Sequence, residues 1–347
     1  MAQSKITQQH IADALSLSRN TVSKALNNDP GMPEDTKRRV IQKALELGYT
    51  KFQQDLPPAE SAPAKNRLVS LLTHSDYMGN HYWSTFLRGL NGTLKEAGYT
   101  LAMTIVDMEE ERELRLPALF LQQKPAGVIM IGPFLREYYE VIEAAGIPSI
   151  FIDTHAEFNL GLLRSDIMLV DNAHSVYTLT RALIAQGHRQ IGFVGDIGSC
   201  LSYRERWTGF QQALREADLR VNEACCIINT MKRHYYNEDE LQEAFAAMKH
   251  KPSAFVCVND AIALEMMQVI RNAGLRIPDD IVLTGFDNIT EAMLVQPSLT
   301  TVHVPKEELG MRAGEQIVWR MDNISRPKEL VRLAVDIIWR DSFQQPV

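Results

Sequence analysis

The sequence contains little cysteine and no long hydrophobic run. Four cysteines occur in 347 residues, which is too few for a disulfide framework, and none has the CxxC spacing typical of metal sites. We therefore expect buried free thiols. No run approaches the roughly 18 apolar residues that cross a bilayer, and the first residues lead into polar sequence. We expect a cytoplasmic protein without a membrane segment.

Sequence motifs of catalysis are also missing. The chain has no GxxxxGK[ST], HExxH or GxSxG motif, and its nine histidines lack the helical spacing of metal ligands. Gly192, Gly195 and Gly198 follow a predicted strand, but their GxxGxxG spacing differs from the GxGxxG of dinucleotide-binding loops. We expect no catalytic residue, no metal and no cofactor.

The composition is that of a globular protein with unevenly distributed charge. Hydrophobic residues make up 45% and charged residues 23% of the chain, whose length suits two or three domains. The net charge is −7, yet residues 1–52 carry eight basic and five acidic side chains, a net of +3 that leaves −10 for the rest. A small basic head on an acidic body favours a DNA-reading module joined to a part that avoids DNA.

The basic head has the apolar spacing of three short helices. The pattern predicts helices over residues 7–15, 18–27 and 33–48, with Thr7 and Ser18 as caps. The first two, joined by a tight turn, form a helix-turn-helix. The second directs only polar side chains outward: Arg19, Asn20, Ser23, Lys24 and Asn27. Such a face can hydrogen-bond to base edges and phosphates; the alternative is a small bundle whose polar face meets only water.

The body alternates short apolar runs with amphipathic segments. The runs typical of buried strands cover residues 68–72, 101–106, 128–131, 149–152, 191–195, 254–258 and 281–285. Helical patterns between them include 82–97, 206–217 and 261–273. This alternation predicts an α/β fold with doubly wound parallel sheets. About 280 residues exceed one such sheet, so we expect two lobes with a ligand in the crevice between them.

Motifs along nearly the whole chain resemble a single family. The head carries Ser18-Arg19-Asn20-Thr21-Val22-Ser23-Lys24-Ala25-Leu26-Asn27, and the body carries Asn259-Asp260, Ile277-Pro278-Asp279-Asp280 and Gly285-Phe286-Asp287. On these residues the chain closely resembles LacI/GalR-family transcription regulators. The resemblance implies an N-terminal all-α helix-turn-helix head and a two-lobed core like that of periplasmic sugar-binding proteins, each lobe built on a doubly wound parallel sheet.

The same resemblance implies DNA contacts in the head. It assigns base contacts to Arg19, Asn20, Ser23 and Lys24, and phosphate contacts to Thr7, Thr21 and Asn27. We also expect Lys37 to meet phosphate. Ser16 departs from the family, which usually has a glycine at this turn because glycine accepts a left-handed backbone without strain.

The resemblance also implies a domain plan. It places a DNA-binding domain at 1–50 and an effector-binding and dimerisation core at 67–347. The lobes are expected to exchange segments, the first taking about 67–167 plus 301–325 and the second about 168–300 plus 326–341. Residues 51–66 contain three prolines, which predict an extended linker where the family usually has a hinge helix.

Polar side chains at predicted strand ends indicate a ligand rich in hydroxyl groups. Carboxylate, amide and guanidinium groups can each meet two hydroxyls, while an aromatic ring covers an apolar face. The residues that match effector-lining positions of the family are Trp83, Asp153, Arg206, Asn259 and Asp287. Weaker candidates in neighbouring loops are His74, Ser75, Asp76 and Tyr203.

These expectations combine into an allosteric transcription regulator, most simply a repressor, that binds a sugar or sugar derivative. A homodimer is expected, because two heads related by a two-fold axis read a pseudo-palindromic operator in double-stranded DNA with useful specificity. Candidate dimer surfaces are the helix over 305–321 and the segment 271–281. The alternative is a sugar-binding module without a DNA role, which would leave the head unexplained.

Overall fold

The computed structural model describes residues 6–26, 29, 31–47, 49, 67–75, 81–157, 164–228 and 238–343. The chain divides into two units, residues 1–65 and 66–347. The linker predicted over 51–66, and the candidates Asn27 and Asp76, lie outside the described residues.

The head unit consists of three helices around a small apolar centre. They are α1 (Gln8–Leu15), α2 (Arg19–Leu26) and α3 (Glu34–Glu46). Their buried side chains are Ile11, Ala12, Val22, Ala25, Val40, Ala44 and Tyr49. The turn between α1 and α2 places Ser16 at φ 54°, the left-handed conformation for which glycine is the usual choice. The Ser18 hydroxyl accepts the backbone N–H of Thr21 at 3.0 Å, so Ser18 caps α2.

The first lobe of the core is built on a six-stranded parallel sheet with the order β10-β5-β4-β3-β1-β2. Its strands are β1 (Leu68–Thr73), β2 (Thr100–Ile105), β3 (Gly127–Ile131), β4 (Ser149–Ile152), β5 (Asp166–Val170) and β10 (Leu330–Leu333). The helices of this lobe are α4 (His81–Glu96), α5 (Met108–Arg112), α6 (Ala118–Gln123), α7 (Arg136–Ala144) and α13 (Lys306–Asp322).

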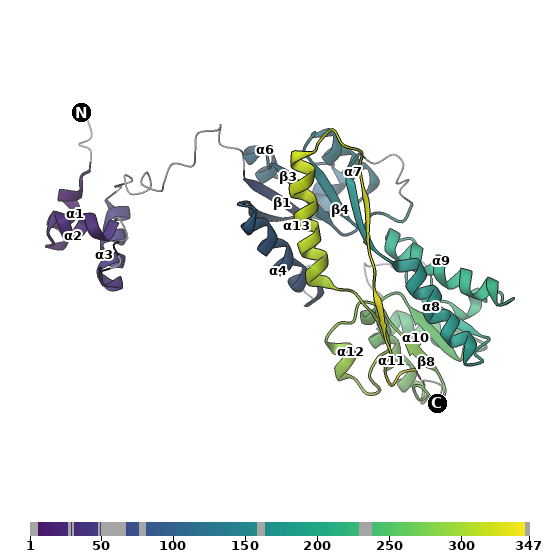
Figure 1. Cartoon of the computed structure of the whole chain (residues 1–347). Helices are drawn as coiled ribbons and strands as arrows, with labels where there is room; N and C mark the ends of the chain where they lie inside the picture. Colours follow the sequence, from purple (N-terminus) through teal and green to yellow (C-terminus); the bar gives the residue numbers. More distant parts are fainter. Residues whose placement is uncertain are drawn as a thin grey trace. The chain divides into compact units, whose positions relative to one another are not determined.

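Helices α4 and α13, far apart in sequence, pack side by side against one face of this sheet (Figure 1). Their close approach depends on glycine: a Cβ at Gly89 would collide with the Glu307 carbonyl, and one at Gly310 with the Phe86 carbonyl. The opposite face of the sheet packs against a second apolar cluster that includes Phe120, Tyr138 and Tyr139. The sheet is therefore covered on both sides, as the doubly wound prediction required.

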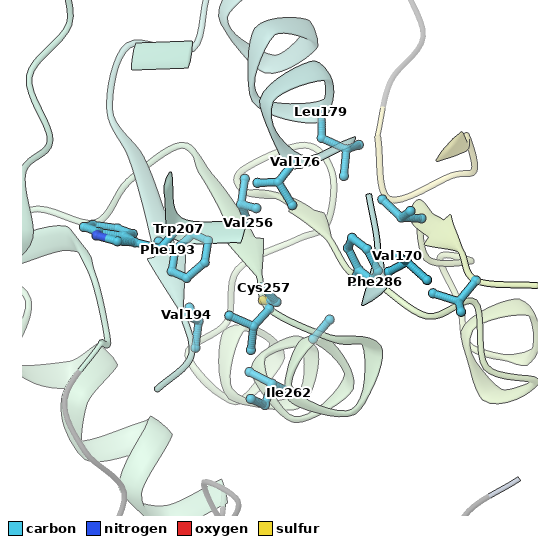
Figure 2. Packing of buried hydrophobic residues seen from close by; sticks show 14 of the residues in the cluster. Val170, Val176, Leu179, Phe193, Val194, Trp207, Val256, Cys257, Ile262 and Phe286 are labelled. Atoms are coloured by element: carbon cyan, nitrogen blue, oxygen red, sulfur yellow. The ribbon is translucent and has the colours of Figure 1, made fainter. Parts of the chain in front are cut away.

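The second lobe is built on a three-stranded parallel sheet with the order β6-β7-β8. Its strands are β6 (Ile191–Val194), β7 (Ala254–Cys257) and β8 (Val282–Thr284), and its helices are α8 (Asn172–Ala185), α9 (Leu201–Glu216), α10 (Glu238–Ala247), α11 (Asp260–Asn272) and the short α12 (Glu291–Leu294). Phe193 and Trp207 pack edge to face with ring centroids 5.1 Å apart, in the cluster that Figure 2 shows with Val256 and Ile262. The predicted α/β fold class is confirmed.

The exchange of segments between lobes differs from the expectation. Residues 326–341 were expected in the second lobe, but β10 pairs in parallel with β5 in the first sheet. The cause is a buried anchor: the Asp166 carboxylate accepts the Glu329 N–H at 2.8 Å and pairs with Arg320 of α13. The chain then leaves the first lobe, and β11 (Asp336–Ile338) pairs antiparallel with β9 (Thr301–His303).

Candidate functional site

The core contains a cavity of about 310 Å³ where the two lobes meet. It lies beyond the carboxyl ends of strands from both sheets, where open α/β folds bind ligands. All five side chains predicted to hold the effector line it: Trp83, Asp153, Arg206, Asn259 and Asp287. The first two belong to the first lobe. Arg206 lies within α9 of the second lobe, and Asn259 and Asp287 follow its strands β7 and β8.

Arg206, on the second turn of α9, is the central cation of the cavity. It is only 5% exposed, and its guanidinium lies over the Phe286 ring with the central carbon 3.5 Å from the ring centroid. Its Nε donates to Asn172 Oδ1 at 2.9 Å and its Nη1 to the Val258 carbonyl, while Nη2 lies 3.9 Å from Asp287 Oδ1. These two hydrogen bonds use the Nε–H and one N–H of Nη1. The other guanidinium N–H groups stay available to a ligand in the cavity that Arg206 lines.

Asp287 follows β8 in a strained backbone conformation. Its φ is 109°, and its carbonyl accepts a hydrogen bond from Lys306 Nζ, which also donates to the Asn288 carbonyl at 3.2 Å. Burial raises the pKa of Asp287 to about 6, although Arg206 and Lys306 oppose that shift. Burial likewise raises the pKa of the neighbouring Asp260 to about 7. Strain and perturbed acidity together are typical of a functional position.

Asp153 joins the lobes at the end of β4. Its φ is 68°, and its Oδ1 accepts the N–H of Thr154 at 2.8 Å and of Ser202 at 3.1 Å. Ser202 belongs to α9 of the second lobe, so this carboxylate bridges the cleft. Burial raises its pKa, and hydrogen bonds from Ser202 and Thr154 act in the opposite direction.

Asn259 and Trp83 complete the predicted set. Asn259 caps α11 through Oδ1, which accepts the Ile262 N–H at 2.9 Å, and its Nδ2 donates to the Tyr203 hydroxyl at 2.7 Å. It therefore has a structural role in addition to its place on the wall. Trp83 is half-buried and edge-on to Tyr82, with ring centroids 4.7 Å apart.

Some loop candidates are placed elsewhere, and other lining residues were not predicted. His74 is buried and pairs with Glu111 at 3.1 Å, and neither it nor Ser75 is among the described residues that line the cavity. Tyr203 does line it. The residues that the sequence analysis missed include Tyr82, Cys200, Ser202 and Glu291. Cys200 and Ser202 lie at the start of α9, directly after the loop that follows β6. That position could have indicated a place in the site, because loops after strands gather at this edge.

In the head, the candidate DNA-contacting side chains that the structure describes are all at least partly accessible. Arg19, Asn20 and Lys24 of α2 are exposed, and Thr21 and Ser23 are partly exposed. Thr7 is exposed at the start of α1. The expectation that Lys37 contacts phosphate is wrong. Lys37 is only 7% exposed, so it packs within the head and is not available to phosphates.

Other kinds of site are not found in the part of the chain that the structure describes. No group of three or more His, Cys, Asp or Glu side chains there could hold a metal ion. No described helix is both long and apolar enough to cross a membrane.

Comparison with known proteins relates both units to a single class. Residues 180–343 match the family model of a periplasmic binding protein-like domain. The HTH-type transcriptional repressor PurR of Vibrio parahaemolyticus is 25% identical over 344 residues, covering 98% of this chain and 99% of the relative. PurR of Photobacterium profundum is 26% identical, covering 97% of this chain and 98% of the relative. Both relatives are transcriptional repressors by name.

Solved structures share the fold over the same length. The transcriptional regulator CelR in complex with cellobiose has a TM-score of 0.69 at 21% identity, covering 97% of this chain and 100% of that one. The lac repressor dimer bound to operator and the anti-inducer ONPF has a TM-score of 0.66 at 21% identity, covering 97% and 98%. Head, cavity and comparisons define a DNA-binding regulator with a periplasmic-binding-protein-like core. Together with the sequence motifs, these similarities support a regulator of the LacI/GalR family.

Proposed function

We propose that this protein is a cytoplasmic transcriptional repressor whose affinity for operator DNA is set by a small neutral polyol bound between the lobes of its core. The observation that carries the proposal is the convergence of Asp153 from the first lobe with Arg206 and Asp287 from the second on one cavity. A ligand that contacts both lobes favours one lobe arrangement over the other and so shifts the population of the whole molecule.

The head supplies the DNA contacts in this proposal. Arg19, Asn20, Ser23 and Lys24 of α2 face base edges, and Thr7, Thr21 and Asn27 face phosphates. A homodimer presents two such helices to the half-sites of a pseudo-palindrome in double-stranded DNA. The accessible polar face of α2 favours this function over a sugar-binding module without a DNA role.

The dimer surface stays a prediction. One side of α13 is occupied by α4 and the first sheet, so a partner would contact its outer side, where Met311 is 45% exposed. The segment 271–281 is mostly exposed and remains available for the same role.

The charges of the cavity indicate a ligand without an anionic group. The charged side chains among its described lining residues are Asp153, Arg206, Asp287 and Glu291, three acids against one base. Arg206 already donates to Asn172 and the Val258 carbonyl. A phosphate would therefore face three carboxylates with a single cation, two of whose N–H groups are already used. Hydroxyl groups suit the cavity, because they donate to carboxylates and accept from the remaining guanidinium N–H groups.

Thermal unfolding of the full chain with matched ligands tests this proposal. We expect a neutral sugar from a panel that includes cellobiose and ribose to raise the Tm, because a ligand that binds only the native state stabilises it. The phosphorylated counterpart of that sugar should leave the Tm unchanged. A larger shift with the sugar phosphate, or no shift with any neutral sugar, would contradict the assigned ligand class.

A further inference from the structure

A continuous set of hydrogen bonds leads from the cavity to the outer surface of the lobe junction. It starts at Arg206, whose Nε donates to Oδ1 of the fully buried Asn172 at 2.9 Å. On the other side of the same amide, Asn172 Nδ2 donates to Glu205 Oε2 at 3.1 Å and to the Val170 carbonyl at 3.1 Å. Glu205 in turn accepts two hydrogen bonds from Arg332, at 2.8 and 2.5 Å.

The chemistry of these groups fixes the direction of each bond. The Glu205 carboxylate and the Val170 carbonyl can only accept, so the amide nitrogen of Asn172 must face them. Its oxygen must then face Arg206, where it accepts the Nε–H. Glu205 and the Val170 carbonyl therefore together favour the amide orientation that holds the guanidinium of Arg206 in place.

The outer pair also joins the two lobes. Arg332 lies on β10, in register with Leu169 of the first sheet. Glu205 lies on α9. Trp207, two residues further along the same helix, packs in the apolar cluster of the second lobe (Figure 2). The two-fold hydrogen bond raises the pKa of Arg332, and charge-assisted pairs with this geometry are among the stronger surface interactions. In Figure 1 the C-terminal stretch that carries Arg332, drawn in yellow, runs from the first lobe into the second.

We infer that Arg332 and Glu205 are positioning residues that orient Arg206 through Asn172 and hold the lobes together at the same point. The orientation of a cavity cation is thus tied to the closure of the lobes. The inference takes the identity of the cavity as a ligand site from the proposed function. Its test needs no ligand, so the two can fail separately.

Two cysteines report on lobe closure and on global unfolding. Cys200 precedes α9, lines the cavity and is 6% exposed, and burial keeps the pKa of its thiol well above the usual range. We expect it to become reactive when the lobes separate, because the cavity wall is then open to solvent. Cys257 lies in β7 and is 1% exposed, so it reacts only when the second lobe unfolds. The alkylation rate of each thiol follows the population of its open state when closing is fast.

The experiment is native-state alkylation of the full chain with N-ethylmaleimide, followed by peptide mass spectrometry. In Arg332→Ala and in Glu205→Gln we expect Cys200 to react up to about fivefold faster, the range that loss of one partly exposed ion pair allows, with Cys257 unchanged. Arg332→Lys keeps the charge but not the paired geometry and should be intermediate. The control is Arg88→Ala, which removes a similar paired contact with Glu307 inside the first lobe and should change neither rate.

A double-mutant cycle tests the connection to Arg206. If the contacts act as one unit, Arg332→Ala combined with Arg206→Lys should accelerate Cys200 by less than the product of the two separate effects. Independent, multiplying effects would overturn the positioning role. An unchanged Cys200 rate in Arg332→Ala, or a rise that Cys257 matches, would overturn the role in lobe closure.

Discussion

Arg206→Ala is expected to reduce ligand affinity at least about 100-fold, because charge-assisted hydrogen bonds to a ligand each contribute about 1.5–3 kcal/mol. The same change leaves Asp287 without its nearest cavity cation and leaves Asn172 Oδ1 and the Val258 carbonyl without their shared donor. Removing one member of a buried charged set costs about 3–5 kcal/mol of folding free energy. The measurements are urea unfolding and calorimetric titration with the sugar that raises the Tm.

Two further variants separate binding from folding. Arg206→Lys retains the charge but not the planar fork, so it should keep more stability than the alanine variant while still binding poorly. Arg215→Ala removes an exposed arginine from the last turn of the same helix and should alter neither property. Near-normal ligand affinity in a folded Arg206→Lys or Arg206→Ala protein would remove Arg206 from the site.

Arg320→Ala is expected to destabilise the core by about 3–5 kcal/mol, as for other buried pairs that lose one partner. Arg320 and Asp166 are 7% and 1% exposed in their side chains and pair at 2.6 Å. Arg320 also donates to the carbonyls of Arg326 and Pro327, which fixes the turn before β10. Loss of this anchor should shift the urea midpoint of the core strongly.

The exposed Arg326 provides a control for this prediction. Arg326→Ala keeps the backbone carbonyl that Arg320 binds and should change the free energy of unfolding by less than about 0.5 kcal/mol. If Arg320→Ala unfolded at the same urea concentration as Arg326→Ala, the buried pair would not be what holds β10 beside β5.

Much of the cavity could be predicted from the sequence because its side chains follow strands. The apolar run 254–258 forms β7, and Asn259 comes directly after it. Asp153 and Asp287 follow β4 and the apolar run of β8 in the same way. Parallel strands bring their carboxyl ends to one edge, so short local patterns were sufficient to gather these groups.

Features that depend on pairing between distant segments could not be predicted. The stretch 331–338 has the composition of one strand, yet it forms parts of two sheets because the Asp166 anchor selects the partner of β10. The contact between Glu205 and Arg332 joins positions 127 residues apart, and no local pattern indicates it. His74 and Glu111 are also far apart in the sequence, and no local pattern indicates that they pair.

The burial of Lys37 could have been predicted from its spacing in the sequence. Lys37 lies three residues before Val40 and seven before Ala44, both fully buried. In a helix these positions share one face, so the spacing already placed Lys37 on the inward side of α3. The charge of Lys37 led us to expect a phosphate contact, but its position on the helix predicts a buried side chain.

Regulated binding to operator DNA is tested by selecting duplexes from a random DNA library with the full chain. The affinity for the selected duplex is then measured with and without the stabilising sugar. We predict two half-sites related by two-fold symmetry, a sugar-dependent change in affinity, and a base preference that Arg19→Ala relaxes at particular positions by about 1–3 kcal/mol. No enrichment over random duplex, in the presence or absence of the sugar, would contradict this prediction.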